Sequence, residues 1–159
     1  MIPLSPLKKI EIRPIGVVKR TSSDEDVKDR NLVSQIVLTK GLSKALDGIE
    51  DFSHIFVIFW MHKISNAEKQ SVHLGGKPEL PLVGIFATRA PTRPNPIGLT
   101  LVELVKRKHN VLWVRGLDAL DGTPVLDIKP YPDWAQGRWI VVTNFRAPKW
   151  LTKINKQNC

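Results

Sequence analysis

GIFATRAPTRPNPIGLTLVELV, residues 84–105, places two apolar runs on either side of a segment that cannot be helical. Pro91, Pro94 and Pro96 each lack an amide hydrogen, so none of them can donate to a helix or a sheet. Each proline also pushes the residue before it into extended geometry. The segment therefore predicts two strands, over 82–87 and 99–106, joined by a stiff, extended loop.

This loop carries four polar side chains, those of Arg89, Thr92, Arg93 and Asn95. Polar residues on a loop held by rigid strands are a common arrangement for a binding or catalytic site. Two other interpretations stay open. Either the loop is a rigid surface turn whose arginines are solvated, or Arg89 forms a structural ion pair with Glu103 or Asp127.

Two signatures along the chain resemble those of one known family. The first is Phe86-Ala87-Thr88-Arg89, followed by Arg93-Pro94-Asn95-Pro96-Ile97-Gly98. The second is Leu-Asp-x-x-Asp-Gly-Thr-Pro at 117–124, followed by Asp-Ile-Lys-Pro-Tyr at 127–131, and Ile15-Gly16-Val17-Val18 is similar to the opening strand of the same family. Over about residues 12–132 the chain resembles the TsaA/TrmO family. The resemblance implies an S-adenosylmethionine-dependent tRNA methyltransferase built on a small β-barrel.

Charge and cysteine content suggest the partners and the compartment. The chain of 159 residues has a formal net charge of +9, which favours polyanions such as RNA, DNA or an acidic membrane face, although charge also serves solubility. Its one cysteine, Cys159, has no internal disulfide partner, which fits a reducing cytoplasm. No apolar run approaches the roughly 18 residues of a membrane-spanning helix, and residues 1–9 lack the apolar core of a signal peptide. We therefore expect a cytoplasmic protein without a membrane segment.

Several other segments have the pattern of strands. We predict strands over 10–19, with a kink near Pro14, and over 34–38, 54–62, 111–117 and 125–128. Residues 55–61 are all apolar, which indicates a strand buried on both faces or a short buried helix, and their β-branched and aromatic content favours the strand. Residues 41–46 predict a helical turn, 21–31 and 63–81 predict loops, and Asn110 is expected to take the positive φ of a hairpin turn.

The fold class that follows is mainly β. Seven or eight short strands with a few short helices indicate a single-domain barrel or sandwich over residues 1–159, and the resemblance implies a single small β-barrel. Residues 133–159 extend beyond the resemblance and are basic. Their Trp134, Trp139 and Trp150 are suited either to the core or to stacking on the bases of an anticodon loop.

Several kinds of active site lose their usual support. If 54–62 is one strand, His54 and His62 are roughly 26 Å apart, too far to share a metal ion, and we expect no metal. The chain has no glycine-rich phosphate loop, no dinucleotide fingerprint and no nucleophile elbow. The missing glycine-rich loop also argues against the commonest methyltransferase architecture, so the methyltransferase prediction rests on the resemblance.

The resemblance implies S-adenosylmethionine as the cofactor. The positions it marks as cofactor-binding are Asp29, Arg30, Asn31, His62, Lys63, Arg89, Leu99, Asp118, Ala119, Leu120 and Asp121. Arg30 or Arg89 can clamp the cofactor carboxylate in bidentate geometry. Asp118 and Asp121 can accept hydrogen bonds from ribose hydroxyls or from the ammonium group. As alternatives, the two aspartates are only turn formers, and His62 is a satisfied histidine at the end of a strand.

In this family the methyl acceptor is N6 of the adenosine at position 37 of the anticodon loop, which already carries a threonylcarbamoyl group. Because that nitrogen is amide-like and relatively acidic, a hydrogen-bond acceptor beside it suffices as a general base. The catalytic candidates are Asp121, Asn95 and Tyr131, in no order of preference. The residues expected to contact the substrate RNA are Arg93, Asn95, Lys129 and Tyr131.

The sequence thus predicts a tRNA adenine-N6-methyltransferase with tRNA as its partner. A non-catalytic RNA-binding β-barrel and a methyltransferase for another substrate remain as alternatives. A barrel of this size offers a shallow pocket, and the family is dimeric. We therefore expect a homodimer in which the second subunit completes the site.

Overall fold

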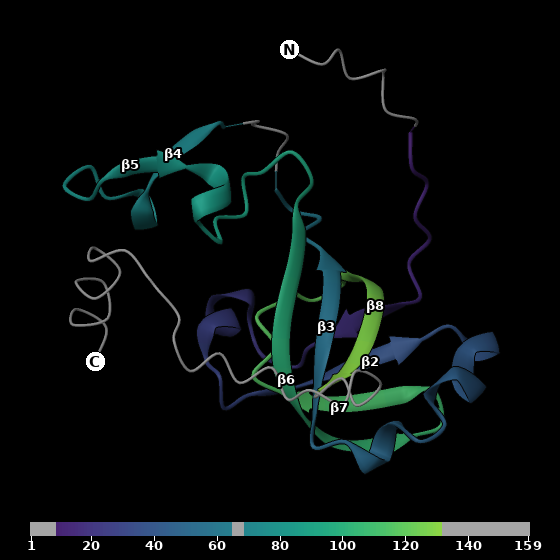
Figure 1. The fold of residues 1–159 in the computed structure, drawn as a ribbon. Helices are drawn as coiled ribbons and strands as arrows, with labels where there is room; N and C mark the ends of the chain where they lie inside the picture. The colour runs from purple at the N-terminus through teal and green to yellow at the C-terminus, as the bar shows by residue number, and fades with distance from the viewer. Residues whose placement is uncertain (1–8, 65–68, 132–159) are drawn as a thin grey trace.

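The computed structural model of the protein describes residues 9–64 and 69–131, and its centre is a closed barrel of six antiparallel strands (Figure 1). Around the barrel the strands follow the order β1 (Gly16–Lys19), β2 (Val33–Leu38), β7 (Val111–Arg115), β6 (Ile97–Lys108), β3 (His54–Trp60) and β8 (Pro124–Tyr131). Pairing of β8 with β1 closes the barrel. The expected mainly β fold with one small barrel is confirmed.

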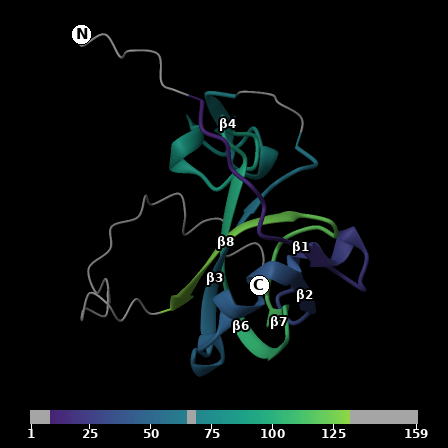
Figure 2. The same ribbon diagram turned by 90° about the vertical axis from the view of Figure 1, so that its right-hand side faces the viewer.

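Two further strands, β4 (Ser71–His73) and β5 (Leu82–Gly84), form a separate two-stranded sheet. This hairpin lies beyond one end of the barrel in both views (Figures 1 and 2). Of the eight strands in the described residues, only six therefore build the barrel. The loop expected over 63–81 is wrong at 71–73, where β4 forms. A strand of three residues without alternation leaves no pattern in the sequence.

The barrel interior is filled by alternating side chains of its strands. On β3 the inward residues Ile55, Val57 and Phe59 are buried, whereas the intervening residues are only partly buried. The strand expected at 54–62 is confirmed, but its outer face is not fully buried. Its apolar outer residues hide the inside–outside alternation in the sequence.

Short 3-10 turns connect the strands. They are η1 (Asp24–Lys28), η2 (Lys40–Leu46), η3 (Ile49–Asp51), η4 (Leu74–Gly76) and η5 (Ile85–Ala87). The helical turn expected over 41–46 is confirmed by η2. The strand expected over 82–87 ends at Gly84, where η5 begins, so its second half is wrong.

The remaining strand boundaries differ from expectation in a few places. β1 begins only at Gly16, after the proline that was expected to kink it, and β8 is longer than 125–128. The hairpin between β6 and β7 takes its positive φ at His109 (φ 55) and not at Asn110, so that prediction is wrong. Asn110 instead donates its side-chain amide to the carbonyl of Leu38 (2.5 Å), at the end of β2.

The connections that matter for function leave the barrel at one end. β1, β3 and β7 run toward this end and β2, β6 and β8 run away from it, so residues 20–32, 61–96 and 116–123 all project there. We call this end the mouth. The opposite end carries η2 and η3, where Arg107 binds the carbonyls of Ser43 and Leu46 and the carboxylates of Asp47 and Glu50.

Gly98 allows β6 to pass the ring of Phe59. A Cβ at this position would lie 2.3 Å from two ring carbons of Phe59, which is itself only 4% exposed. We expect Gly98→Ala to lower the free energy of unfolding by about 1–3 kcal/mol, as overpacking usually does. Urea unfolding of the purified variant measures this loss.

Gly41→Ala is the matched control for that experiment. Gly41 has no atom within 4 Å of its added Cβ and no positive φ, so its replacement should leave stability unchanged or slightly increased. A Gly98→Ala variant as stable as the Gly41→Ala variant would contradict the predicted clash.

Trp134, Trp139 and Trp150, together with the rest of the basic extension over 133–159, lie outside the described residues. Within residues 9–64 and 69–131, no helix is long and apolar enough to cross a membrane.

Candidate active site

A cavity of about 210 Å³ opens at the mouth of the barrel. It is lined by Val27, Phe59, Met61, His62, Lys63, Ile64, Asp118, Ala119, Leu120 and Thr123. These residues come from the β1–β2 connection, from the end of β3 and from the β7–β8 connection. Five residues expected to bind the cofactor, His62, Lys63, Asp118, Ala119 and Leu120, therefore meet at one cavity.

Asp118 lines this cavity, and its carboxylate has two partners. One of its oxygens accepts a hydrogen bond from the hydroxyl of Thr100, which is 6% exposed on the inner side of β6. The other oxygen lies 3.4 Å from Arg30. Asp118 is thus more than a turn former, because its carboxylate is held between the barrel wall and the β1–β2 connection.

Arg30 belongs to the expected cofactor-binding tripeptide. Besides its ion pair with Asp118, it donates to the carbonyl of Gly116 at 2.7 Å. Its two neighbours are exposed, and the carboxylate of Asp29 accepts from the backbone amide of Asn31 at 2.8 Å. The structure brings the tripeptide to the rim of the cavity through Arg30.

Arg20 links two of the connections at the mouth. The sequence did not mark it as a site residue. Its guanidinium donates to the carbonyls of Leu117 (3.1 Å) and Ala119 (3.4 Å), and also to the Ser22 hydroxyl (3.0 Å) and the Asp26 carbonyl (3.3 Å). One side chain therefore joins the β1–β2 connection to the β7–β8 connection. No motif marks Arg20, which simply follows a strand that is also basic at Lys19.

A second group of contacts joins the β1–β2 connection to Lys63, which follows β3, and to the β7–β8 connection. The ammonium of Lys63 lies 2.5 Å from the carboxylate of Asp24, which also accepts from the amide of Asp121 at 3.4 Å. The hydrogen bond from Lys63 lowers the pKa of Asp24 below its usual 3.8, desolvation opposes this shift, and the Asp121 amide and Arg20 lower the pKa further. Because this pKa is lowered, the contact persists at neutral pH and is lost only as the pH falls through the lowered value.

His62 and Asp121 lie at the edge of the site. Nδ1 of His62 is 3.3 Å from the Thr123 hydroxyl, so this histidine has a partner although its side chain is exposed. One oxygen of Asp121 accepts from the backbone amide of Arg20 at 2.8 Å. Its other oxygen makes no hydrogen bond within the described part of the chain.

Arg89 and Leu99 do not line this cavity. Arg89 donates to the carbonyl of Leu99 at 3.3 Å and lines a different cavity, on the side of the β4–β5 hairpin. Leu99 is exposed on the outer face of β6, since successive strand residues point to opposite faces and its neighbour Thr100 points inward. Within a single chain, Arg89 and Leu99 therefore lie apart from the other residues that we expect to bind the cofactor.

The ion pair considered for Arg89 is absent from the described residues. Glu103 pairs with Arg115 at 2.7 Å, and Asp127 pairs with Lys129 at 2.8 Å. Arg93 braces the proline-rich loop by donating to the carbonyls of Thr88 and Ala90, both at 3.3 Å.

The three catalytic candidates are not brought together within one chain. Asn95 precedes β6 and is at the mouth, but it lines a separate cavity with Trp60, Ile97 and the segment around Ile10 and Ile12. Tyr131 ends β8 at the opposite end of the barrel, where its ring packs edge-on against Phe56. The seven steps of β8 place it about 23 Å from Pro124. Asp121 alone lies beside the cavity.

The chain is similar to several known proteins. Residues 23–135 match the family model described as the tRNA-methyltransferase O N-terminal domain. A probable S-adenosyl-L-methionine-binding protein of Methanothermobacter thermautotrophicus is 47% identical over 128 residues, which are 77% of this chain and 90% of that protein. The mouse tRNA (adenine(37)-N6)-methyltransferase is 45% identical over 91 residues, which are 55% of this chain but only 20% of the mouse protein.

A solved structure gives the same result. A crystal structure of TrmO superposes with a TM-score of 0.69 at 32% identity, over 88% of this chain and 64% of the TrmO chain. The chain therefore spans less than two thirds of TrmO. The resemblance drawn from the two sequence signatures is confirmed. Because the family model covers more than half of its residues, this chain belongs to the TsaA/TrmO family.

Proposed function

We propose that the protein is an S-adenosylmethionine-dependent methyltransferase that acts on N6 of an adenine in tRNA. The observation that carries this proposal is the convergence of His62, Lys63, Asp118, Ala119 and Leu120 on one cavity at the barrel mouth. Relatives named as S-adenosyl-L-methionine-binding proteins and as tRNA (adenine(37)-N6)-methyltransferases support both the cofactor and the substrate class.

The residues of the cavity suit this cofactor. Val27, Phe59 and Leu120 provide apolar surface for the adenine ring, and Asp118 provides an acceptor for ribose hydroxyls. When bound, the cofactor supplies a methyl group whose bond to sulfur breaks as the bond to N6 forms, and the electron pair of the broken bond stays on sulfur. The cavity is smaller than the roughly 300–1,000 Å³ of typical ligand sites. It holds part of the cofactor, so further residues must close over the remainder.

The chain must also remove the proton from N6. Asp121 is the best placed of the catalytic candidates, because one of its oxygens is fixed by the Arg20 amide and the other has no hydrogen bond in the described part of the chain. We therefore assign the role of proton acceptor to Asp121. The N6 of threonylcarbamoyladenosine at position 37 is the substrate that this weak base fits, because an amide-like nitrogen gives up its proton more readily than a plain amine.

The direct test has two parts. Calorimetry with S-adenosylmethionine should give binding to the wild type and none to Asp118→Ala, whereas Asp51→Ala, at the opposite end of the barrel, should bind as the wild type does. Transfer of labelled methyl groups should then occur to an anticodon stem-loop carrying threonylcarbamoyladenosine and not to the unmodified stem-loop. Binding without transfer to either RNA would favour another substrate. RNA binding without cofactor binding would favour the non-catalytic barrel.

We further propose that the active protein is a homodimer. On the outer face of the barrel, Ile97, Leu99 and Leu101 are 39–47% exposed. Their register partners on β3 are Trp60, Ile58 and Phe56, which are only partly buried. We call these six side chains the outer patch. An apolar patch of this kind on a soluble protein is typical of an interface, and it borders Arg89, which donates to Leu99.

Leu101→Glu should therefore convert the dimer to a monomer, because a charge would be buried without a partner. Sedimentation should give twice the 17.9 kDa chain mass for the wild type and the single chain mass for the variant. Val33→Glu is the control, since Val33 is as exposed (40%) but belongs to β2, across the barrel from β3 and β6. A monomeric wild type would contradict the dimer.

A further inference from the structure

The β4–β5 hairpin is not needed to close the barrel. Its two strands have three residues each and pair in their own sheet. Ile85, which is 3% exposed, extends this pairing, since its amide donates to the carbonyl of Gln70 at 2.9 Å. A two-stranded hairpin of this length is marginally stable alone. What it adds to the molecule is the surface that it forms with the proline-rich loop.

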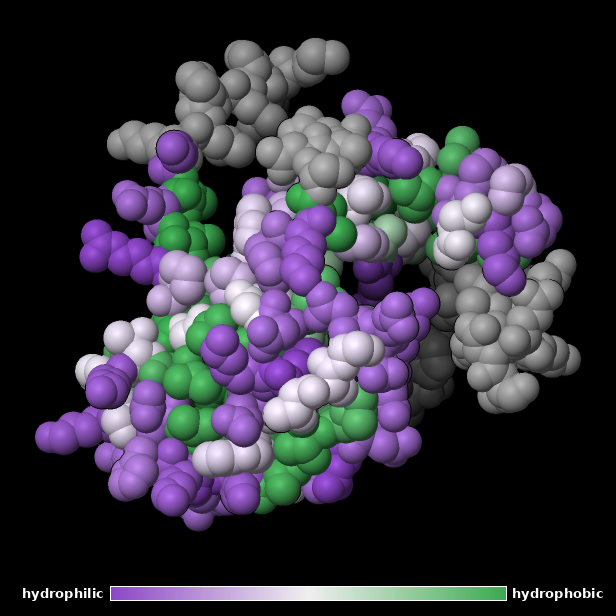
Figure 3. Space-filling model, turned by 180° about the vertical axis from the view of Figure 1, so that it is seen from behind, coloured by the Kyte–Doolittle hydropathy of each residue, from purple (hydrophilic) through white to green (hydrophobic). Residues whose placement is uncertain are grey.

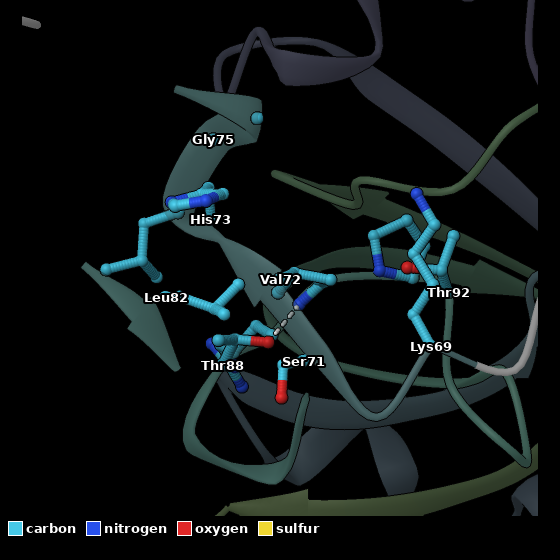
Figure 4. A pocket seen from close by; sticks show the side chains of 13 residues that line it. Lys69, Ser71, Val72, His73, Gly75, Leu82, Thr88 and Thr92 are labelled. Carbon is cyan, nitrogen blue, oxygen red and sulfur yellow. Dashed lines mark hydrogen bonds between the residues drawn. The ribbon is translucent and has the colours of Figure 1, made fainter. Parts of the chain in front are cut away.

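That surface contains a cavity of about 660 Å³, between the hairpin and residues 88–92. Among the residues that line it, Lys69 and Arg89 are cationic, His73 is titratable, and none is a carboxylate. Figure 4 shows His73 and Leu82 on one side of the cavity and Lys69 and Thr92 on the other, with Thr88 and Ser71 between them. The arrangement suits an anion, because the lining carries cations and no carboxylate.

The surroundings of the cavity have the same sign of charge. Between residues 69 and 96 the chain has four Lys and Arg residues but a single carboxylate, that of Glu79. Seen from behind, the hairpin region at the upper right is mostly hydrophilic (Figure 3). Within the cavity, Thr88 is committed to the loop, since its hydroxyl donates to the Ile85 carbonyl and accepts from the Ala90 amide.

The ring of His73 is held on the cavity wall by the backbone of the hairpin. Its Nδ1 lies 2.7 Å from the carbonyl of Leu80, and because a carbonyl only accepts, Nδ1 carries the proton. His73 therefore shapes the wall of the cavity.

An exposed aromatic residue lies close in sequence to the residues that line this cavity. Phe86, on η5, is 79% exposed and precedes Thr88 of the cavity wall by two residues. An exposed aromatic ring next to cations is the usual combination for single-stranded RNA, in which bases stack on the ring while phosphates meet the cations. A polyanion also fits the net charge of +9 that the chain carries.

We propose that Lys69, on the wall of this cavity, binds the phosphate backbone of the RNA substrate, with Phe86 stacking on an unpaired base. The inference rests on the proposed function, because it takes the substrate to be an RNA. It adds a contact site on the hairpin, outside the cavity that holds Asp118.

The test uses the full-length protein and a fluorescent anticodon stem-loop, with affinity measured by anisotropy at several salt concentrations. Lys69→Glu should weaken RNA binding about 10-fold and lower the slope of log affinity against log salt by about 1, as expected for a lost phosphate contact. Phe86→Ala should weaken binding about 10-fold with an unchanged slope, since stacking releases no counterions. Both variants should bind S-adenosylmethionine as the wild type does.

Lys44→Glu provides the matched control. Lys44 is an exposed lysine on η2, which lies across the barrel from the hairpin (Figure 1), so the same charge reversal there should change RNA affinity less than 2-fold. Thermal unfolding checks that all variants are folded. The inference is overturned if Lys69→Glu and Phe86→Ala bind RNA as tightly as Lys44→Glu does, or if they lose cofactor affinity and keep RNA affinity. A wild type that binds no RNA would instead remove the proposed substrate, and this inference with it.

Discussion

An equal mixture of the Arg89→Ala and Asp118→Ala variants, each inactive alone, should recover methyl transfer. If the site is shared between subunits, a mixed dimer has one site with both substitutions and one site with neither. Free exchange of subunits leaves about a quarter of all sites intact in such a mixture. We expect the mixture to reach about that fraction of wild-type activity, measured as methyl groups transferred to the modified stem-loop per total subunit.

The physical reason lies in the wall formed by β6. Thr100 points into the barrel and donates to Asp118, whereas Leu99 points outward and its carbonyl accepts from Arg89. Neither Arg89 nor Leu99 lines the cavity that holds Asp118. The two groups are expected to act on one cofactor, so a second copy seated on the outer patch must bring its own Asp118 to the Arg89 of the first.

A mixture of two variants that both alter the Asp118 cavity is the control for this experiment. His62 and Asp118 line the same cavity, so a mixture of His62→Ala and Asp118→Ala leaves a fault at every site of every mixed dimer. It should recover no activity. Differently tagged subunits show whether mixed dimers have formed. Mixed Arg89→Ala and Asp118→Ala dimers that remain inactive would mean that each site is built by a single chain.

The parts of the site that could be predicted from the sequence are those with a local signature. The turn at 118–121 and the proline-rich loop have compositions that admit few conformations, and each lies between two strands that were expected. The strand over 54–60 was recognisable from its unbroken apolar content, and its end placed His62 and Lys63 at the mouth. In each case the relevant interactions lie within a few residues of the chain.

The parts that could not be predicted depend on contacts between residues far apart in the sequence. Arg20 and Ala119 are 99 residues apart, and no sequence pattern near Arg20 indicates their contact. The separation of Leu99 from Asp118 follows from the inward position of Thr100, which the apolar run 99–105 does not reveal. Tyr131 was placed among the catalytic candidates as a hydrogen-bond acceptor for N6, yet the length of β8 carries it to the far end of the barrel.

Arg20→Met should destabilise the protein and weaken cofactor binding together. Methionine keeps much of the arginine stem but leaves the carbonyls of Leu117 and Ala119, both in buried residues, without their donor. Buried acceptors left unpaired cost about 1–3 kcal/mol each, so we expect a loss of about 2 kcal/mol in the free energy of unfolding. Urea unfolding measures this loss.

Cofactor affinity should fall about 10-fold or more in the same variant, since Ala119 and Leu120 line the cavity and lose their tether to the β1–β2 connection. Calorimetry well below the unfolding temperature separates this effect from unfolding. Arg20→Lys should lie between the wild type and Arg20→Met, because one ammonium cannot bind Ser22 and Asp26 on one side and Leu117 and Ala119 on the other.

Arg107→Met distinguishes positioning from general stability. Arg107 binds three carbonyls and two carboxylates, as extensively as Arg20, but at the opposite end of the barrel. Its replacement should destabilise the fold and leave cofactor affinity unchanged. If Arg20→Met lost only stability, as Arg107→Met does, Arg20 would be a structural residue of the barrel. Because its donors reach both connections that enclose the cavity, we expect the two variants to differ in affinity and to agree in their loss of stability.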